Sequence, residues 1–323
     1  MVNEAVIGQN KPVNKFRDNE SAFGQLINKY IKNKALFFMF VPGLIYYIVF
    51  HYMPMYGLII SFKDFRFLDR IMGSPWVGFR HFEMIFKNEE FWGVFKNTLV
   101  ISGLKLVFNF PAPIILALLL NEVRNIYFKK AIQTISYLPH FLSWVVLSGI
   151  VINFLSPSTG PINMLLSALG MKPVFFVGSN GWFRQVLVGS AMWKEVGWGT
   201  IVYLAALAGV NPELYEAAVL DGAGRLKQTI HVTLPSIAPV IVIMFIFAVG
   251  GIVNDDFDQV FNMYNHAVYR VGDVLSTYIY RVGLENMLYS YSAAVGLFKN
   301  AIAFTLIVIT NQISKKFSDY GLW

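Results

Sequence analysis

Residues 216–235 read EAAVLDGAGRLKQTIHVTLP, a polar stretch that separates two long apolar runs. No Asp, Glu, Lys or Arg occurs from Val196 to Pro212 or from Gln228 to Asn254. Because charged side chains are costly inside a bilayer, we expect these runs to cross the membrane and the stretch between them to lie at its surface. A polar segment of this length is a candidate contact for a protein outside the bilayer.

The whole chain is too apolar for an ordinary soluble domain. Of its 323 residues, 56% are hydrophobic and 14% are charged. A spanning helix needs about 20 mostly apolar residues. The candidates are four uncharged stretches and two stretches broken by single lysines, namely 35–62, 131–171, 196–212, 228–254, 98–120 with Lys105 and 293–313 with Lys299. The sequence therefore predicts an all-α, polytopic membrane protein with six transmembrane helices.

The distribution of basic residues predicts the orientation. With six spans and the N-terminus inside, the inner segments hold 13 Lys and Arg and the longer outer segments hold 8. Basic residues are enriched on the cytoplasmic side of membrane proteins, so both termini are expected in the cytoplasm. Residues 1–34 form a predicted cytoplasmic N-terminal segment and residues 35–323 one transmembrane domain. Within the first, Phe23–Ile31 has the apolar spacing of an interfacial helix, with a frayed tail as the open alternative.

The polar stretch has the local signals of two short helices joined by a turn. Asn211-Pro212-Glu213 is a favourable helix start, which predicts a helix over Glu213–Leu220. Gly222 supplies the positive φ that ends a helix, and a second helix is expected from Ala223 to about Val232. Leu234-Pro235 then marks the return to the membrane. We call residues 209–236 the knuckle.

The knuckle resembles the loop by which permease subunits of ABC importers dock on their ATPase. The matching residues of this EAA–DGA–LP pattern are Glu216, Ala217, Ala218, Asp221, Gly222, Ala223, Leu234 and Pro235. One departure is Thr229, which stands where many members have an aromatic residue.

The resemblance extends over roughly residues 25–323. Gly160–Asn163 and Trp193–Tyr215 are similar to carbohydrate permeases of the maltose-permease superfamily. Pro54–Leu58, Gly73–Phe79 and Ser276–Leu284 resemble its polysaccharide and oligosaccharide branch, which includes alginate, pectic and aldouronate permeases. The resemblance implies the type I, MetI-like permease fold in the bacterial cytoplasmic membrane.

The resemblance also implies a function and partners. The expected protein is a permease subunit that moves oligosaccharides, including acidic ones such as alginate-type oligouronides, by alternating access. The expected partners are a second permease subunit, two ABC ATPase subunits and an extracytoplasmic solute-binding protein; no nucleic acid is expected. The chain has no GxxxxGK[ST] loop, so ATP and Mg²⁺ are expected in the ATPase subunits, with no cofactor bound here and no enzyme activity.

Polar and aromatic residues within the spans are candidates for the substrate path. Such residues usually face a protein interior or a water-filled path, and aromatic faces beside hydrogen-bonding groups suit sugar rings. The candidates are Trp193, Lys194, Glu195, Trp198, Asn254, Lys299 and Asn300. For each of them, a helix-packing role is the alternative.

Two other classes of protein remain as alternatives. An ion-coupled secondary transporter usually has internal repeats, and this chain shows none. The run Asn254–Asp258 fits the NDxxD signature of membrane prenyltransferases, in which carboxylates bind Mg²⁺ and a diphosphate. No second acidic cluster follows, so the prenyltransferase is a remote alternative. We expect the acidic run to be a solvated outer rim of the protein instead.

Overall fold

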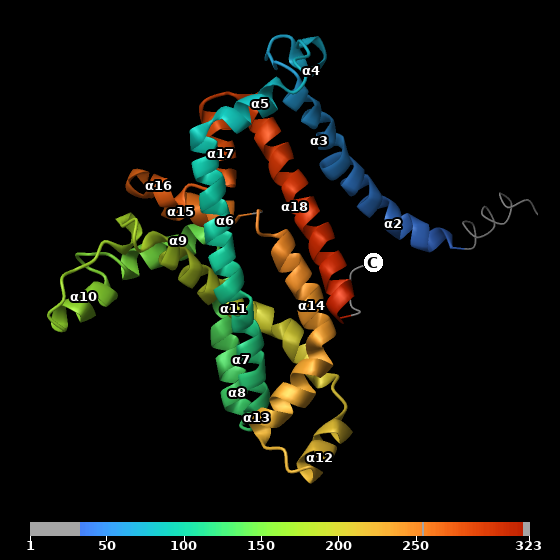
Figure 1. Cartoon of the computed structure of the whole chain (residues 1–323), viewed down its shortest axis with the longest axis vertical. Helices are drawn as coiled ribbons and strands as arrows, with labels where there is room; N and C mark the ends of the chain where they lie inside the picture. The colour runs from blue at the N-terminus through green and yellow to red at the C-terminus, as the bar shows by residue number, and fades with distance from the viewer. Residues whose placement is uncertain (1–32, 254, 319–323) are drawn as a thin grey trace, which may run out of the picture. The chain divides into compact units, whose positions relative to one another are not determined.

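A computed structural model describes residues 33–253 and 255–318 (Figure 1). The predicted segment 1–34, with its interfacial helix, therefore lies almost entirely outside the described residues. Within the described ranges the chain is helical, and the pairing of Lys63 with Trp76 is an isolated β-bridge. The all-α class is confirmed. The chain forms two compact units, residues 1–58 and 59–323, and each is described by itself.

The first unit contains one apolar helical segment. Helix α2 (Lys34–Tyr47) continues through a π turn (Ile48–Tyr52) and α3 (Met53–Met55). It contains Pro42, and it is apolar on all sides because no charged residue follows Lys34 before the unit ends. A helix of this composition is typical of a membrane span.

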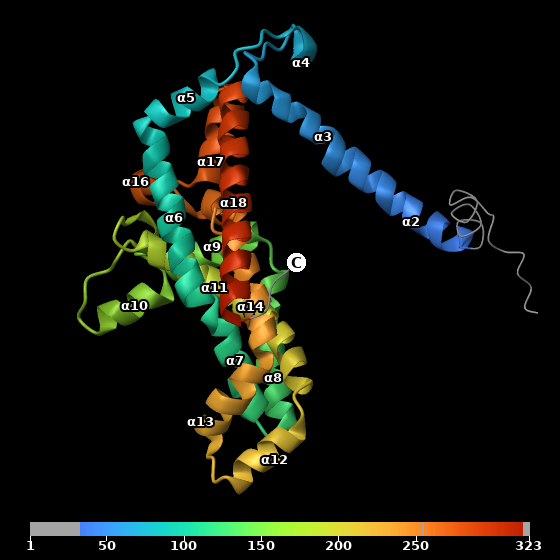
Figure 2. The same cartoon turned by 45° about the vertical axis from the view of Figure 1, so that its right-hand side comes forward.

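The second unit contains fifteen of the described α-helices. Their bounds are α4 (Arg70–Gly73), α5 (Arg80–Lys87), α6 (Glu89–Asn109), α7 (Pro111–Glu122), α8 (Ile126–Tyr137), α9 (Trp144–Phe154), α10 (Pro161–Ala168), α11 (Phe183–Ala208), α12 (Pro212–Leu220), α13 (Arg225–Gln228), α14 (Leu234–Gly250), α15 (Phe257–Met263), α16 (Tyr269–Gly272), α17 (Leu275–Tyr280) and α18 (Tyr289–Ser318). Helices α12 and α13 lie at one end of this unit, and α4, α5 and the start of α18 lie at the other (Figures 1 and 2).

Among the described residues, four helical segments are long and apolar enough to cross a membrane. They are Lys34–Phe62, Glu89–Glu122, Arg225–Gly250 and Tyr289–Lys316. Helix α11 has 26 residues, but it holds Arg184, Lys194 and Glu195 and is less apolar. The count of six spans and the side of each terminus stay predictions.

The uncharged stretch 131–171 does not form one straight span. It is bent by 108° between Ile126–Phe141 and Trp144–Phe154. A new helix starts at the break because the Ser143 hydroxyl caps α9 by accepting from the Val146 amide at 3.4 Å. If the two bent parts form one span, they add a fifth candidate.

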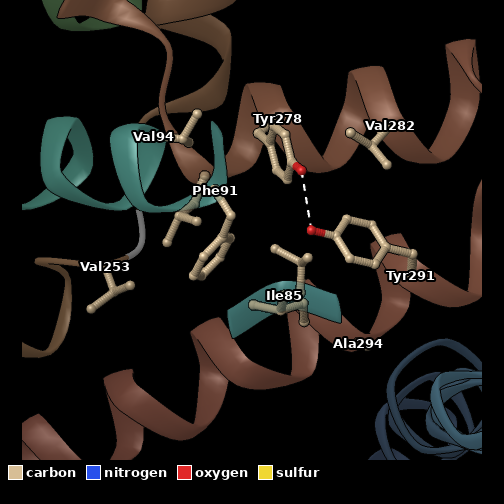
Figure 3. Packing of buried hydrophobic residues seen from close by; sticks show 10 residues of the cluster. Ile85, Phe91, Val94, Val253, Tyr278, Val282, Tyr291 and Ala294 are labelled. Carbon is tan, nitrogen blue, oxygen red and sulfur yellow. Dashed lines mark hydrogen bonds between the residues drawn. The ribbon is translucent and has the colours of Figure 1, made fainter. Parts of the chain in front are cut away.

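The end of the unit opposite the knuckle has a core of aromatic and aliphatic side chains. Phe91, Tyr278 and Tyr291 pack with residues of α5, α6, α17 and α18 (Figure 3). The hydroxyls of the two tyrosines lie 3.2 Å apart, and the Asn88 side-chain amide donates to both. Asn88 also caps α6 through its side-chain oxygen. One residue therefore starts a helix and satisfies two buried hydroxyls.

Helix α11 lies at the centre of the second unit, where it packs against α6, α7, α8 and α14. The approach to α8 is close at Gly197, because a Cβ there would lie 2.1 Å from the Ser136 carbonyl oxygen. The atom met belongs to the backbone of α8, which cannot move aside as the end of a flexible side chain can. The glycine therefore sets the distance between the two helices.

Gly197→Ala tests this contact. We expect it to destabilise the protein by about 1–3 kcal/mol, because the added methyl forces α8 and α11 apart. The matched control is Gly189→Ala in the same helix, where a Cβ meets no atom within 4 Å. Thermal unfolding of both variants in detergent checks this: only Gly197→Ala should unfold at a lower temperature, and equal unfolding temperatures would contradict the packing described.

Candidate functional site: the knuckle and a polar cavity

The first limb of the knuckle begins as the sequence predicts. The Asn211 side-chain oxygen accepts from the Glu213 amide at 3.1 Å, and Pro212 occupies the first turn of α12. Proline suits this position because the first amides of a helix have no partner within it. The start of α12 is therefore fixed by its own local sequence.

The turn after α12 is a Schellman motif. Gly222 has φ +75°, its amide donates to the Val219 carbonyl at 3.0 Å, and the Ala223 amide donates to the Ala218 carbonyl at 2.9 Å. This is the hydrogen-bond pattern by which a left-handed glycine ends a helix. The predicted positive φ at Gly222 is confirmed.

The second limb of the knuckle differs from the prediction in two ways. It begins at Arg225 rather than Ala223, and it does not end near Val232. It passes through a π turn (Thr229–Thr233) into α14, so that Arg225–Gly250 is a single helical segment. Pro235 lacks an amide hydrogen and crowds the preceding turn of a regular helix. The wider π turn accommodates it, and the knuckle is joined to the span without a break.

The knuckle exposes apolar side chains as well as the residues of the predicted docking pattern. Leu220 is 88% exposed and Leu226 is 72% exposed. Glu216, Ala217, Asp221, Gly222 and Pro235 are exposed, and Ala218, Ala223 and Leu234 are half-buried. A partner that binds the knuckle would cover these apolar side chains.

Two side-chain contacts hold the base of the knuckle together. The hydroxyls of Tyr215 and Thr233 lie 3.0 Å apart and join the two limbs. Arg225 pairs with Glu122 at the end of α7, with 3.2 Å between nitrogen and oxygen. The limbs are therefore tied to each other and to a neighbouring helix.

A polar cavity of about 560 Å³ lies between α6, α11, the end of α14 and α15. Its polar lining residues are Ser102, Lys105, Asn109, Glu195, Asp255 and Asp256. The Lys105 ammonium donates to the Gln259 side chain, which in turn donates to the Leu187 carbonyl and the Ser190 hydroxyl. Burial raises the pKa of Asp256, and the nearby positive charge of Lys105 opposes this shift.

Lys194 lies beside the bend between α8 and α9. Its ammonium donates to the His140 carbonyl at 2.7 Å and to the Leu142 carbonyl at 2.6 Å, and it lies 5.6 Å from the Trp144 ring centroid. These carbonyls belong to the segment in which the chain changes direction. Lys194 therefore holds the bend, and its predicted contact with a substrate stays a prediction.

The other candidates on α11 point in different directions. Glu195 lines the polar cavity and pairs with the His140 ring at 3.0 Å. That ring stacks on Trp198 with 4.4 Å between centroids. Trp193 instead lines a separate apolar cavity of about 490 Å³ with Trp182. The structure thus brings Glu195 and Trp198 together through His140, which the sequence analysis did not select, and leaves Trp193 apart.

The acidic run after α14 is not the solvated rim expected from the sequence. The Asp255 side chain is 3% exposed and lies 3.7 Å from the Lys299 ammonium. Asp258 is exposed, as is Asn300, and Asn254 lies outside the described residues. Among the residues described, no group of three or more His, Asp or Glu is arranged to bind a metal, so the prenyltransferase alternative gains no support.

Comparison with known proteins identifies a family and close relatives. Residues 109–316 match the family described as binding-protein-dependent transport system inner membrane component. Protein LplB of Bacillus subtilis (strain 168) is 44% identical over 292 residues, which cover 90% of this chain and 92% of LplB. The polygalacturonan/rhamnogalacturonan transport system permease protein YteP of the same organism is 43% identical over 299 residues, 93% of each chain.

A solved structure agrees with these relatives. It is the crystal structure of a bacterial alginate ABC transporter in complex with an alginate pentasaccharide-bound periplasmic protein. One of its chains is 40% identical to this chain and matches it with a TM-score of 0.85, covering 92% of this chain and 100% of its own length. The family match over residues 109–316 includes the knuckle.

Gly222→Ala tests the geometry of the knuckle. We expect it to lower the free energy of opening the end of α12 by roughly 1–2 kcal/mol, because a Cβ disfavours the left-handed conformation. A clash does not contribute, since a Cβ at Gly222 meets no atom within 4 Å. Amide hydrogen exchange at Gly222 and Ala223 measures the change.

Two controls accompany that variant. Gly222→Asn should exchange almost as slowly as the parent, because asparagine tolerates the left-handed region. Gly224→Ala should have no effect, since Gly224 has φ −69° and open space around it. Equal exchange in Gly222→Ala and the parent would show that the turn does not depend on the glycine.

Proposed function

The chain belongs to the family of binding-protein-dependent transport system inner membrane components, and we propose that its knuckle receives the movement of an ATPase. The protein is a multi-pass inner-membrane permease subunit of an ABC importer for oligosaccharides. The observation that carries the proposal is the exposed knuckle, whose second limb continues without a break into a span.

The mechanism that we propose is alternating access in a complex. Two ATPase subunits, which hold ATP and Mg²⁺, bind the knuckles of this chain and of a second permease subunit. A solute-binding protein delivers the sugar on the other side, as the periplasmic protein in the alginate transporter structure suggests. Closure of the ATPase pair moves the knuckles, and the attached spans turn the shared cavity outward.

We place the sugar path of this chain at the polar cavity. Its volume of about 560 Å³ is within the usual range of ligand sites, about 300–1,000 Å³. Two of its carboxylates have cationic neighbours, because Asp255 faces Lys299 and Asp256 faces Lys105, and Glu195 contacts the His140 ring. The cavity therefore does not present bare negative charge to an anionic sugar.

Acidic oligosaccharides are the first substrates to test. YteP is named for polygalacturonan and rhamnogalacturonan transport, and the solved structure is that of an alginate ABC transporter. Both relatives match more than nine-tenths of this chain at 40% identity or above. We therefore propose oligouronides as the substrate class of this importer.

Glu216→Ala tests the knuckle as an ATPase contact. We expect the ATPase subunits to be lost when the tagged variant is purified from native membranes in mild detergent, because Glu216 is exposed on α12 and belongs to the docking pattern. The control is Glu213→Ala on the same helix, exposed but outside the pattern. Mass spectrometry of the co-purified proteins measures the amount of ATPase. Full recovery of the ATPase with Glu216→Ala would show that Glu216 is not part of the ATPase contact.

Lys105→Met tests the charge of the cavity. We expect uptake of an oligogalacturonide to fall about tenfold more than uptake of a neutral oligosaccharide of equal length. The variant removes the positive charge beside Asp256, and a tenfold difference corresponds to about 1.4 kcal/mol of lost interaction with an anionic sugar. Lys194→Met is the comparison, and it should reduce both uptakes alike because its ammonium holds two carbonyls. A selective loss in Lys194→Met alone would restore the assignment made from the sequence.

A further inference from the structure

A buried carboxylate just after α14 joins four segments of the second unit. The Asp255 side chain accepts from the Ser276 amide at 3.2 Å and from the Thr98 hydroxyl at 3.5 Å. Its other oxygen lies 3.7 Å from the ammonium of Lys299 on α18, and that ammonium donates to the Ser276 hydroxyl at 2.7 Å. The segment after α14 is therefore attached to α6, α17 and α18 at one point.

The same carboxylate lies just beyond the helix that carries the knuckle. Arg225–Gly250 is helical without a break, and Asp255 follows its end by five residues. At that end Gly250 lies close to α18, because a Cβ there would meet the Ile307 side chain at 2.5 Å. One end of this helix is therefore the knuckle, and the other leads directly into the Asp255 attachment.

We propose that Asp255, paired with Lys299, is the positioning residue that fixes the outer end of α14, so that movement of the knuckle is passed to α6, α17 and α18. Without this attachment, a push along α14 would be taken up by the Gly250-Gly251 turn. The proposal rests on the proposed coupling role of the knuckle. It gives Lys299 a task other than the substrate contact expected from the sequence.

The chemistry of the pair suits attachment better than binding of a sugar. Both side chains are buried, and each also has polar partners in the protein. A buried charge without its partner is strongly destabilising, so the two segments are held at a fixed separation. The neighbouring Asp256 lines the polar cavity, so a shift of this segment changes the cavity directly.

The test follows the cavity itself and needs no sugar. The chain contains no cysteine, so Ser102→Cys introduces a single thiol into the cavity lining. The whole importer, purified through a tag on this chain, is reconstituted into vesicles. The rate of maleimide labelling is measured without nucleotide and after trapping with ATP and vanadate, and ATP hydrolysis is measured in parallel.

The decisive variant is Asp255→Asn with Lys299→Met in the Ser102→Cys background. Removing both charges avoids a lone buried charge and is expected to leave the fold intact. We expect trapping to change the labelling rate about tenfold in the reporter alone and less than about twofold in the double variant. ATP hydrolysis should continue in both. The charge swap Asp255→Lys with Lys299→Asp should recover part of the response.

Two further variants make the outcome unambiguous. Ser276→Ala removes a hydrogen-bond partner of Lys299 without changing charge, and it should weaken the response of the cavity to trapping. It replaces the double variant as the test if the double variant does not assemble. Asp258→Asn, an exposed acid in the same run, should respond as the reporter does. A full response in the double variant, or in Ser276→Ala where only that variant assembles, would overturn the proposal. Absence of ATPase subunits from the reporter complex would instead overturn the proposed function.

Discussion

The π turn at Thr229–Thr233 is the local feature on which the rest of the proposed mechanism depends, because it lets Pro235 lie within a continuous helix. A kink or break at this proline would separate the knuckle from the membrane. Instead, 26 residues from Arg225 to Gly250 form one segment, about 39 Å long at the usual rise per residue. The Schellman turn at Gly222 sets the direction of the first limb against it. A protein that grips α12 therefore acts, through the turn at Gly222, on the end of a long helical segment.

Ionisable groups among the helices of the second unit hold separate segments together. Lys194 donates to the carbonyls at a sharp bend, Lys105 donates to Gln259, and Lys299 pairs with Asp255. Charges at such depth are costly unless they have partners or face water. Their partners come from separate helices, so each also fixes a contact between helices. Lys105 and Asp255 also line the cavity that we assign to the sugar, which couples its shape to the positions of the helices.

Local signals made part of this structure predictable from the sequence. The Asn211 cap, the helix after it and the positive φ of Gly222 depend on neighbouring residues, and they are as expected. The continuity through Pro235 was missed because proline usually ends a helix. The bend in 131–171 was missed because uncharged composition alone does not reveal it, although Ser143 gave a usable capping signal. The Asp255–Lys299 pair joins residues far apart in the sequence, and no spacing rule predicts such a contact.

The central claim is that this chain works as the permease of an ATP-driven importer. The most direct measurement is uptake of oligogalacturonides and alginate oligosaccharides by vesicles that contain the complex purified through this chain. The account predicts that a second permease and ATPase subunits are present and that uptake needs ATP and the solute-binding protein, while collapse of ion gradients by ionophores leaves it intact. Uptake by the isolated chain, driven by an ion gradient without ATP, would contradict the account and favour a secondary transporter.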